Sequence, residues 1–143
     1  MFKFRLASIQ RLHEYNEKRC KEEVGKCVSM LQLAEARLAE LEQLARETQK
    51  QLACAQEGNV AITQVLLGSC YLKHLHDLIE QQKIFVAEKS IALKEAQAKL
   101  GEAVKNRKII QKIREKQYRN FLLEENRREQ LFNDELALAA RRR

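Results

Sequence analysis

Apolar residues recur at heptad spacing along the second half of the 143-residue chain. The positions of this ladder are Leu72, Ile79, Val86, Leu93 and Leu100. Such a repeat predicts a helix whose apolar seam packs against another helix, as in a coiled coil. The next three heptad positions are Arg107, Arg114 and Phe121. The apolar seam therefore gives way to a basic stretch that continues the same predicted helix.

The first half of the chain repeats apolar residues in alternating steps of three and four, which also indicates a coiled coil. These positions are Leu31, Ala34, Leu38, Leu41, Ala45, Thr48, Leu52 and Ala55, preceded at the same steps by Leu6, Ile9, His13, Asn16 and Cys20. Between Cys20 and Val24 an extra four-residue step predicts a stutter, which would locally relax the supercoil. Gly25 lies beside it, and a glycine within a helix costs roughly 1 kcal/mol relative to alanine. We expect this point to be the weakest in the first helix.

Turn signals divide the chain into two helical arms. There is no proline and there are only four glycines, and Gly58-Asn59 is the clearest turn signal. We predict an all-α fold, a single antiparallel coiled-coil domain over 1–143. Its first arm covers about 3–57, a connecting loop or short helix covers 58–68, and its second arm covers about 69–140. In that hairpin, residue i lies opposite about residue 126 − i.

Positive charge is concentrated in the last third of the chain, residues 101–143, which carries 12 basic and 7 acidic residues. The net charge of the whole chain is +7. Between Lys105 and Arg119 there are seven cations and one acid, Glu115. This segment is either a solvated helix face or a cationic end that enters an acidic or polar cavity. Nucleic acid is a third partner, because phosphates attract basic patches without sequence specificity.

A second candidate surface lies near the predicted connection. The heptads place Leu41, Thr48, Leu72 and Ile79 in the seam, Leu44 just off it, and Tyr71, Leu75 and Leu78 toward its edge. Exposed apolar residues grouped in this way mark docking surfaces. The alternative is that they cover the flanks of the seam or pack on the connection.

Catalytic and metal-binding chemistry has little support in the sequence. The four cysteines, Cys20, Cys27, Cys54 and Cys70, have no CxxC spacing. Reduced thiols in a cytoplasm are the simplest interpretation. Cys70, His74 and His76 lie close together, but zinc requires four ligands. There is no phosphate-binding glycine loop and no pairing of nucleophile with base, so we expect neither an enzyme nor a cofactor. We also expect no secretory signal and no transmembrane segment.

Several segments resemble the FliJ family, a coiled-coil component of the flagellar type III export apparatus. The segments are Phe2-Lys3-Phe4-Arg5-Leu6 at the start, Tyr71-Leu72-Lys73-His74-Leu75 with Ile79-Glu80-Gln81-Gln82 in the middle, Lys105-Asn106-Arg107-Lys108 with Ile113-Arg114-Glu115-Lys116, and Arg127-Arg128-Glu129-Gln130-Leu131-Phe132-Asn133-Asp134-Glu135-Leu136-Ala137 near the end. The resemblance covers essentially the whole chain.

The resemblance implies a rotor-stalk-like hairpin whose terminal end inserts into the hexameric export ATPase. Its connection end contacts the export-gate membrane protein, and export chaperones are further partners. It also implies a cytoplasmic protein, peripheral at the inner membrane. The residues implied at the gate, here called the connection-end surface, are Leu41, Leu44, Thr48, Tyr71, Leu75, Leu78 and Gln82. Those implied at the ATPase, here called the terminal surface, are Phe4, Arg5, Arg11, Arg114, Arg119, Arg127, Arg128, Gln130 and Asp134.

Three alternatives to a flagellar export stalk remain at this point. One is the equivalent stalk of a virulence secretion system. Another is a helical hairpin that binds nucleic acid through residues 105–119. The third is a coiled-coil adaptor that homodimerises through exposed seam residues.

Overall fold

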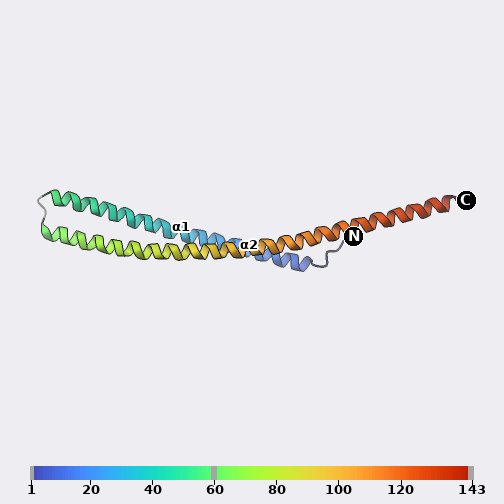
Figure 1. Ribbon diagram of the computed structural model, residues 1–143, viewed down its shortest axis with the longest axis horizontal. Coiled ribbons are helices and arrows are strands. Elements are labelled where there is room, and N and C mark those ends of the chain that lie inside the picture. Colours follow the sequence, from blue (N-terminus) through green and yellow to red (C-terminus); the bar gives the residue numbers. More distant parts are fainter. Residues whose placement is uncertain (1, 59–60, 142–143) are drawn as a thin grey trace. The chain divides into compact units, whose positions relative to one another are not determined.

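Two long helices account for nearly all of the chain that the computed structural model describes, residues 2–58 and 61–141. Helix α1 spans Ala7–Glu57 and helix α2 spans Ile62–Arg141 (Figure 1). No strand occurs in these two ranges. The prediction of an all-α fold in which two long helices form a hairpin is confirmed.

The connection is shorter than the sequence predicts. Residues 62–68, which we assign to the connection from their turn signals, are helical and open α2. Gly68 does not break the helix: a Cβ built on it would lie 2.5 Å from Leu52 Cδ2, so the glycine permits a close approach of α1. Ser69 Oγ donates a hydrogen bond to the Val65 carbonyl at 2.8 Å, as serine does inside a helix. Gly58 is in a turn, whereas Asn59 lies outside the described residues. At the other end, residues 3–6 precede α1 and are not helical.

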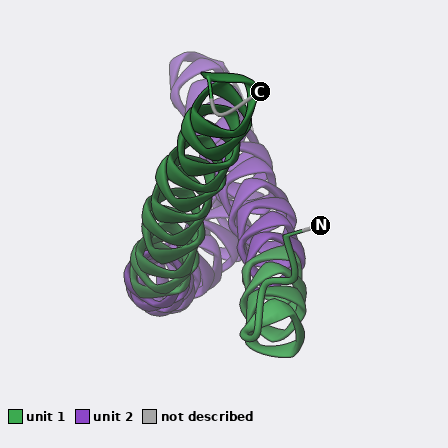
Figure 2. Ribbon diagram, turned by 90° about the vertical axis from the view of Figure 1, so that its right-hand side faces the viewer, with its two compact units in different colours: residues 1–19, 100–143 green, residues 20–99 purple. Residues whose placement is uncertain are grey.

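The chain divides into two compact units, each containing one segment of each helix (Figure 2). Unit 1 comprises Met1–Arg19 and Leu100–Arg143, and unit 2 comprises Cys20–Lys99. In unit 2 the core cluster consists of Leu41, Ala45, Leu75 and Ile79, with Leu38, Leu72 and Leu78 packed against it. Apolar burial along one stripe of each helix therefore holds this unit together.

The register in unit 2 differs from the predicted one. The sequence predicts Ala34 opposite about residue 92, but the Ala34 carbonyl accepts a hydrogen bond from Gln82 Nε2 at 3.0 Å. The predicted partner of Ala45 is about residue 81, but Ala45 clusters with Leu75 and Ile79. Both shifts have the direction that follows from α2 beginning at Ile62 rather than near residue 69.

The seam of unit 1 contains polar residues upstream of the step at which the sequence predicts a stutter. Ile9 is 41% exposed and Asn16 is exposed, whereas Gln10 is half-buried and Glu17 is buried. With Gln10 and Glu17 in the seam, the steps of three and four continue to Val24 and beyond without interruption. The predicted stutter is therefore absent, because the seam contains Gln10 and Glu17 in place of the predicted Ile9 and Asn16.

Partners on α2 explain why these polar residues face inward. Glu17 Oε2 forms an ion pair with Arg107 Nε, and Gln10 Oε1 accepts a long hydrogen bond of 3.5 Å from Arg114. Arg107 and Arg114 are the first two basic positions of the interrupted ladder, one heptad apart. They therefore hold α1 by charge and hydrogen bonding, because buried charges require paired partners.

Replacing Gly25 with alanine should stabilise the hairpin by about 1 kcal/mol, since alanine loses less backbone entropy than glycine on forming a helix. A Cβ at this position would meet no atom within 4 Å, so no packing cost opposes the gain. Urea denaturation followed by circular dichroism measures the change.

Two other glycines are controls for this prediction. Gly101→Ala should stabilise by a similar amount because its Cβ also meets open space, whereas Gly68→Ala would force Leu52 to move. Equal stabilisation by all three variants would show that the close approach at Gly68 has no energetic role.

Two candidate docking surfaces

Three of the seven residues of the connection-end surface lie inside the seam. Leu41 is 6%, Thr48 9% and Leu75 2% exposed. The sequence places Leu75 toward the edge, but it is the largest fully buried side chain among the described residues. Thr48 Oγ1 satisfies its hydrogen-bonding capacity within α1 by donating to the Leu44 carbonyl at 2.8 Å. These three side chains shape the hairpin and present little surface to a partner.

The other four residues of this surface differ in accessibility. Leu44 is 40% and Tyr71 45% exposed. Leu78 is half-buried against the core, and Gln82 is held by its hydrogen bond to Ala34. The accessible part of the connection-end surface is therefore formed by Leu44 on α1 and by Tyr71 with part of Leu78 on α2.

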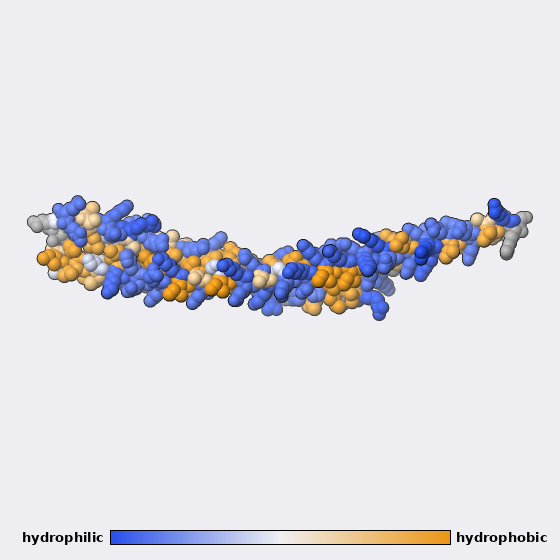
Figure 3. Space-filling view, viewed as in Figure 1, coloured by the Kyte–Doolittle hydropathy of each residue, from blue (hydrophilic) through white to orange (hydrophobic). Residues whose placement is uncertain are grey.

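The first turns of α2 add exposed apolar residues that the turn signals in the sequence would place in the connection. Ile62 is 78%, Leu66 60% and Leu67 76% exposed. Figure 3 shows the apolar side chains at this end of unit 2. Leu67 and Tyr71 also line a shallow cavity of about 350 Å³ between α1 and α2. The uncharged run from Val60 to Leu67 is the feature of the sequence that indicates these additional apolar residues. Treating the run as a loop misses the exposed face that its helical part presents.

The terminal surface lies in unit 1, where α2 carries most of its residues. Arg5 and Arg11 are exposed and Phe4 is half-buried. The residues on α2 are all exposed: Arg114, Arg119, Arg127, Arg128, Gln130 and Asp134. Arg114 hydrogen-bonds Gln10, and Arg128 pairs with Glu125 at 3.5 Å on the same helix. The structure thus places these residues in one unit but does not bring them together, since those on α2 are spread along the helix from Arg114 to Asp134.

An aromatic contact ties the start of the chain to α2. The Phe2 ring lies 5.4 Å from the Tyr118 ring, edge to face, and 5.6 Å from the Phe121 ring. Phe121 is the apolar position that follows Arg107 and Arg114 in the ladder. Aromatic pairs at such distances contribute about 0.5–1.5 kcal/mol beyond burial. The contact therefore closes the paired part of unit 1.

The basic segment of α2 has two faces. Arg107 turns toward α1 through its ion pair with Glu17. The other face carries Lys105, Lys108, Lys112, Lys116 and Arg119, which follow one another at three- and four-residue steps and are all exposed. In the described chain none of these five forms an ion pair. The cationic face is thus available to an acidic partner, in addition to being solvated.

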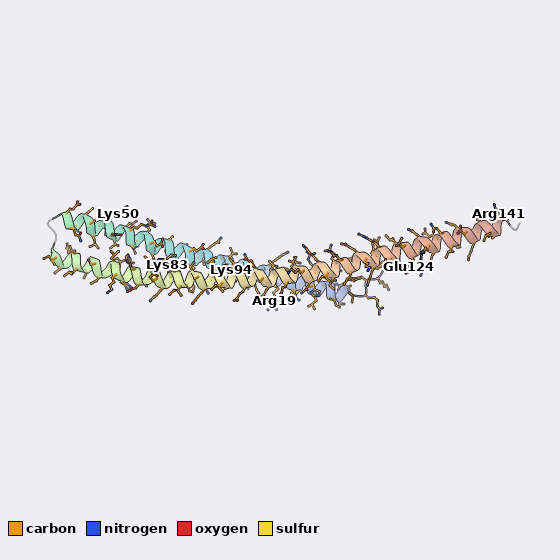
Figure 4. All side chains as sticks on the ribbon, viewed as in Figure 1. Arg19, Lys50, Lys83, Lys94, Glu124 and Arg141 are labelled. Atoms are coloured by element: carbon orange, nitrogen blue, oxygen red, sulfur yellow. The ribbon has the colours of Figure 1, made fainter. Side chains whose placement is uncertain are left out.

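Beyond Phe121, α2 continues without a neighbouring helix in unit 1. Figure 4 shows a single ribbon between Glu124 and Arg141, and every residue from 126 to 141 is exposed. Large apolar side chains recur along this segment: Leu122, Leu123, Leu131, Phe132, Leu136 and Leu138 are 41–64% exposed. A helix with this much exposed apolar surface is typical of a segment that packs on a partner.

The cysteines and histidines form no metal site in residues 2–58 and 61–141, where no group of three or more metal-binding side chains occurs. Cys20, Cys27, Cys54 and Cys70 are free thiols. Among the described helices, none combines the length and apolarity needed to cross a membrane.

Two long helices that pair through an apolar seam define a protein of the coiled-coil class. The family described as "Flagellar FliJ protein" matches residues 2–143, and the chain belongs to this family. No curated protein matches the chain.

A solved structure shares the fold. The chain is similar to a putative YscO homolog, CT670, from Chlamydia trachomatis, with 18% sequence identity and a TM-score of 0.61. The similarity covers 99% of this chain and 96% of that one. The hairpin architecture therefore recurs at low sequence identity.

Proposed function

We propose that the protein is a non-enzymatic stalk of flagellar type III protein export, which docks on the hexameric export ATPase through its terminal surface. Membership of the flagellar FliJ family supports the flagellar system over a virulence system. The observation that carries the proposal is the end of α2, where residues 126–141 are exposed throughout and extend past the last contact of α1. Such a helical end can enter a ring without disturbing the hairpin.

The cationic face of α2 supports an acidic docking site on the ATPase. Lys112, Lys116 and Arg119 are exposed, while Arg107 is already engaged by Glu17. Charge complementarity of this kind steers association and fixes orientation. The exposed apolar residues beyond it, such as Leu131 and Phe132, then supply apolar area that is buried in the complex.

The connection-end surface is proposed to contact the export-gate membrane protein. Tyr71 would act as its main accessible anchor, because tyrosine is among the residues that supply most of the binding energy at interfaces, and Leu44 would add buried apolar area. Leu66 and Leu67 extend the same apolar region toward the connection. A role in escorting export chaperones completes the proposal.

Mixing the chain with its cognate export ATPase should raise ATP turnover and the hexameric fraction. Reversing two exposed charges of the terminal surface, Arg119→Glu with Arg127→Glu, should weaken this activation by about tenfold, since each partner contact turns from attraction to repulsion. Steady-state phosphate release and analytical ultracentrifugation measure the two effects.

The matched control is Lys50→Glu with Lys94→Glu, which makes the same change in net charge on unit 2 (Figure 4). This pair should leave activation unchanged. The stalk proposal is wrong if the unaltered chain changes neither turnover nor assembly. Salt-sensitive binding to any DNA sequence would instead favour the nucleic-acid alternative.

A further inference from the structure

The last 20 described residues of α2, 122–141, form a helix that lacks a neighbour within its unit. Leu131 is 64%, Phe132 62%, Leu136 53% and Leu138 61% exposed. In proteins most helical stability comes from tertiary packing, and this segment packs on no other helix in the described part of its unit. The free chain therefore gains stability from any partner that covers this segment.

Apolar and charged residues share one face of the segment. Steps of three and four connect Arg128, Leu131, Glu135 and Leu138, and Phe132 adjoins Leu131 on the same face. These are the steps that bring side chains to a helix–helix seam. Between residues 128 and 138 this face is apolar except for one cation and one anion, a heptad apart.

This face is complementary to itself only when two copies run antiparallel. If Leu131 lies opposite Phe132 of a second copy, Arg128 lies opposite Glu135 of that copy, and the two-fold axis repeats both pairs. In a parallel pair Arg128 would face Arg128 and Glu135 would face Glu135, which repel. Charge therefore selects both the orientation and the register.

We propose that residues 122–141 of α2 pair with the same segment of a second copy of this chain, as an antiparallel two-helix interface around Leu131 and Phe132. Among the described residues Arg128 forms one ion pair, with Glu125 at 3.5 Å, in which the side chains are 74% and 42% exposed. Such exposed pairs contribute little, so exchanging this contact for Glu135 of the second copy costs little.

The interface is small, and its size limits the affinity of the dimer. Twenty residues of helix span roughly 30 Å, and an interface of that length belongs to the low end of the size range for specific association. We therefore expect a dimer with a dissociation constant of about 10–100 μM. The inference does not depend on the proposed export function, because it concerns the free chain alone.

Sedimentation equilibrium of the full chain from about 5 to 500 μM tests the pairing. Arg128→Glu and Glu135→Arg should each weaken the dimer about tenfold, because both symmetric pairs become repulsive. The double variant carrying both changes restores opposite charges and should return to within about threefold of the original constant. Lys94→Glu, a charge reversal in unit 2, should have no effect.

A photocrosslinking amino acid at position 132 gives the geometry. Attachment to residues 128–135 of the second copy is expected. A chain that stays monomeric at about 500 μM, the highest concentration used in the sedimentation experiment, overturns the proposal. A dimer that is insensitive to both charge reversals, or that crosslinks from position 132 to α1 or to the start of α2, also overturns it. Circular dichroism of each variant confirms that the hairpin is folded.

Discussion

Replacing Leu75 with alanine should lower the free energy of unfolding by about 3 kcal/mol, because the residue is 2% exposed and its removal leaves a cavity between the helices. Leu75 packs with Leu41, Ala45 and Ile79 in the core cluster of unit 2. In a hairpin with so few buried side chains, a loss of this size is a large share of the total stability. Urea denaturation followed by circular dichroism measures it.

Tyr71→Ala separates folding from docking at the same end of the molecule. Tyr71 lies one helical turn before Leu75 but is 45% exposed, so its removal should change stability by less than about 1 kcal/mol. Binding to the proposed export-gate partner, measured by calorimetry, should nevertheless fall. If Tyr71→Ala destabilised the hairpin as much as Leu75→Ala, the assignment of Tyr71 to the accessible surface would be wrong.

Arg107→Ala should destabilise unit 1 by about 2 kcal/mol, since it removes one charged hydrogen-bond donor of a buried carboxylate. The Glu17 side chain is 9% exposed, against 30% for Arg107. Glu17→Ala should therefore cost less than Arg107→Ala, because an arginine left without its partner can turn toward water. Thermal and urea unfolding of the two variants measure this asymmetry.

The double variant Glu17→Leu with Arg107→Leu removes both charges and leaves an apolar pair. Buried ion pairs are often replaced by apolar residues without loss of stability, so this variant should unfold close to the original chain. A double variant as unstable as Arg107→Ala would show that the polar network with Gln111 contributes more than charge neutralisation. Arg107 donates to Gln111 Oε1 at 3.0 Å in that network.

Heptad spacing in the sequence is sufficient to predict the two helices and most of the seam. All eight positions predicted from Leu31 to Ala55 are buried or half-buried. In this stretch the apolar side chains alone determine which face of α1 packs on α2, because no buried ion pair among the described residues draws a polar side chain into the seam. Upstream the rule fails, since Glu17 is buried by an ion pair with Arg107, 90 residues away in sequence. Local spacing gives no sign of such a partner.

The connection is misplaced for a related reason. Gly68-Ser69 has the composition of a turn, yet Gly68 is helical and lies against Leu52. Glycine serves close packing as well as turns, and only the opposite helix distinguishes the two uses. The seven-residue error at the start of α2 then shifts the whole predicted register of unit 2.

The candidate surfaces are predicted as regions rather than as residues. The heptads correctly place Leu41, Thr48 and Ile79 in the seam and Leu44 off it. They misplace Leu75, because an antiparallel seam uses the three-residue step from Leu72 as well as the heptad step to Ile79. The cations of unit 1 are easy to find in the sequence, but composition does not separate Arg107, which faces α1, from the outward Lys105 and Lys108.

The aromatic contact at the start of the chain has a spectroscopic consequence. The chain has no tryptophan and only three tyrosines, so its near-ultraviolet emission comes from Tyr15, Tyr71 and Tyr118. Tyr118 lies against Phe2 in unit 1, whereas Tyr71 borders the cavity in unit 2. Replacing two of the three tyrosines with phenylalanine gives a single-tyrosine variant whose intrinsic fluorescence reports on one site. Each unit can then be monitored separately, without an attached dye, while a partner is added.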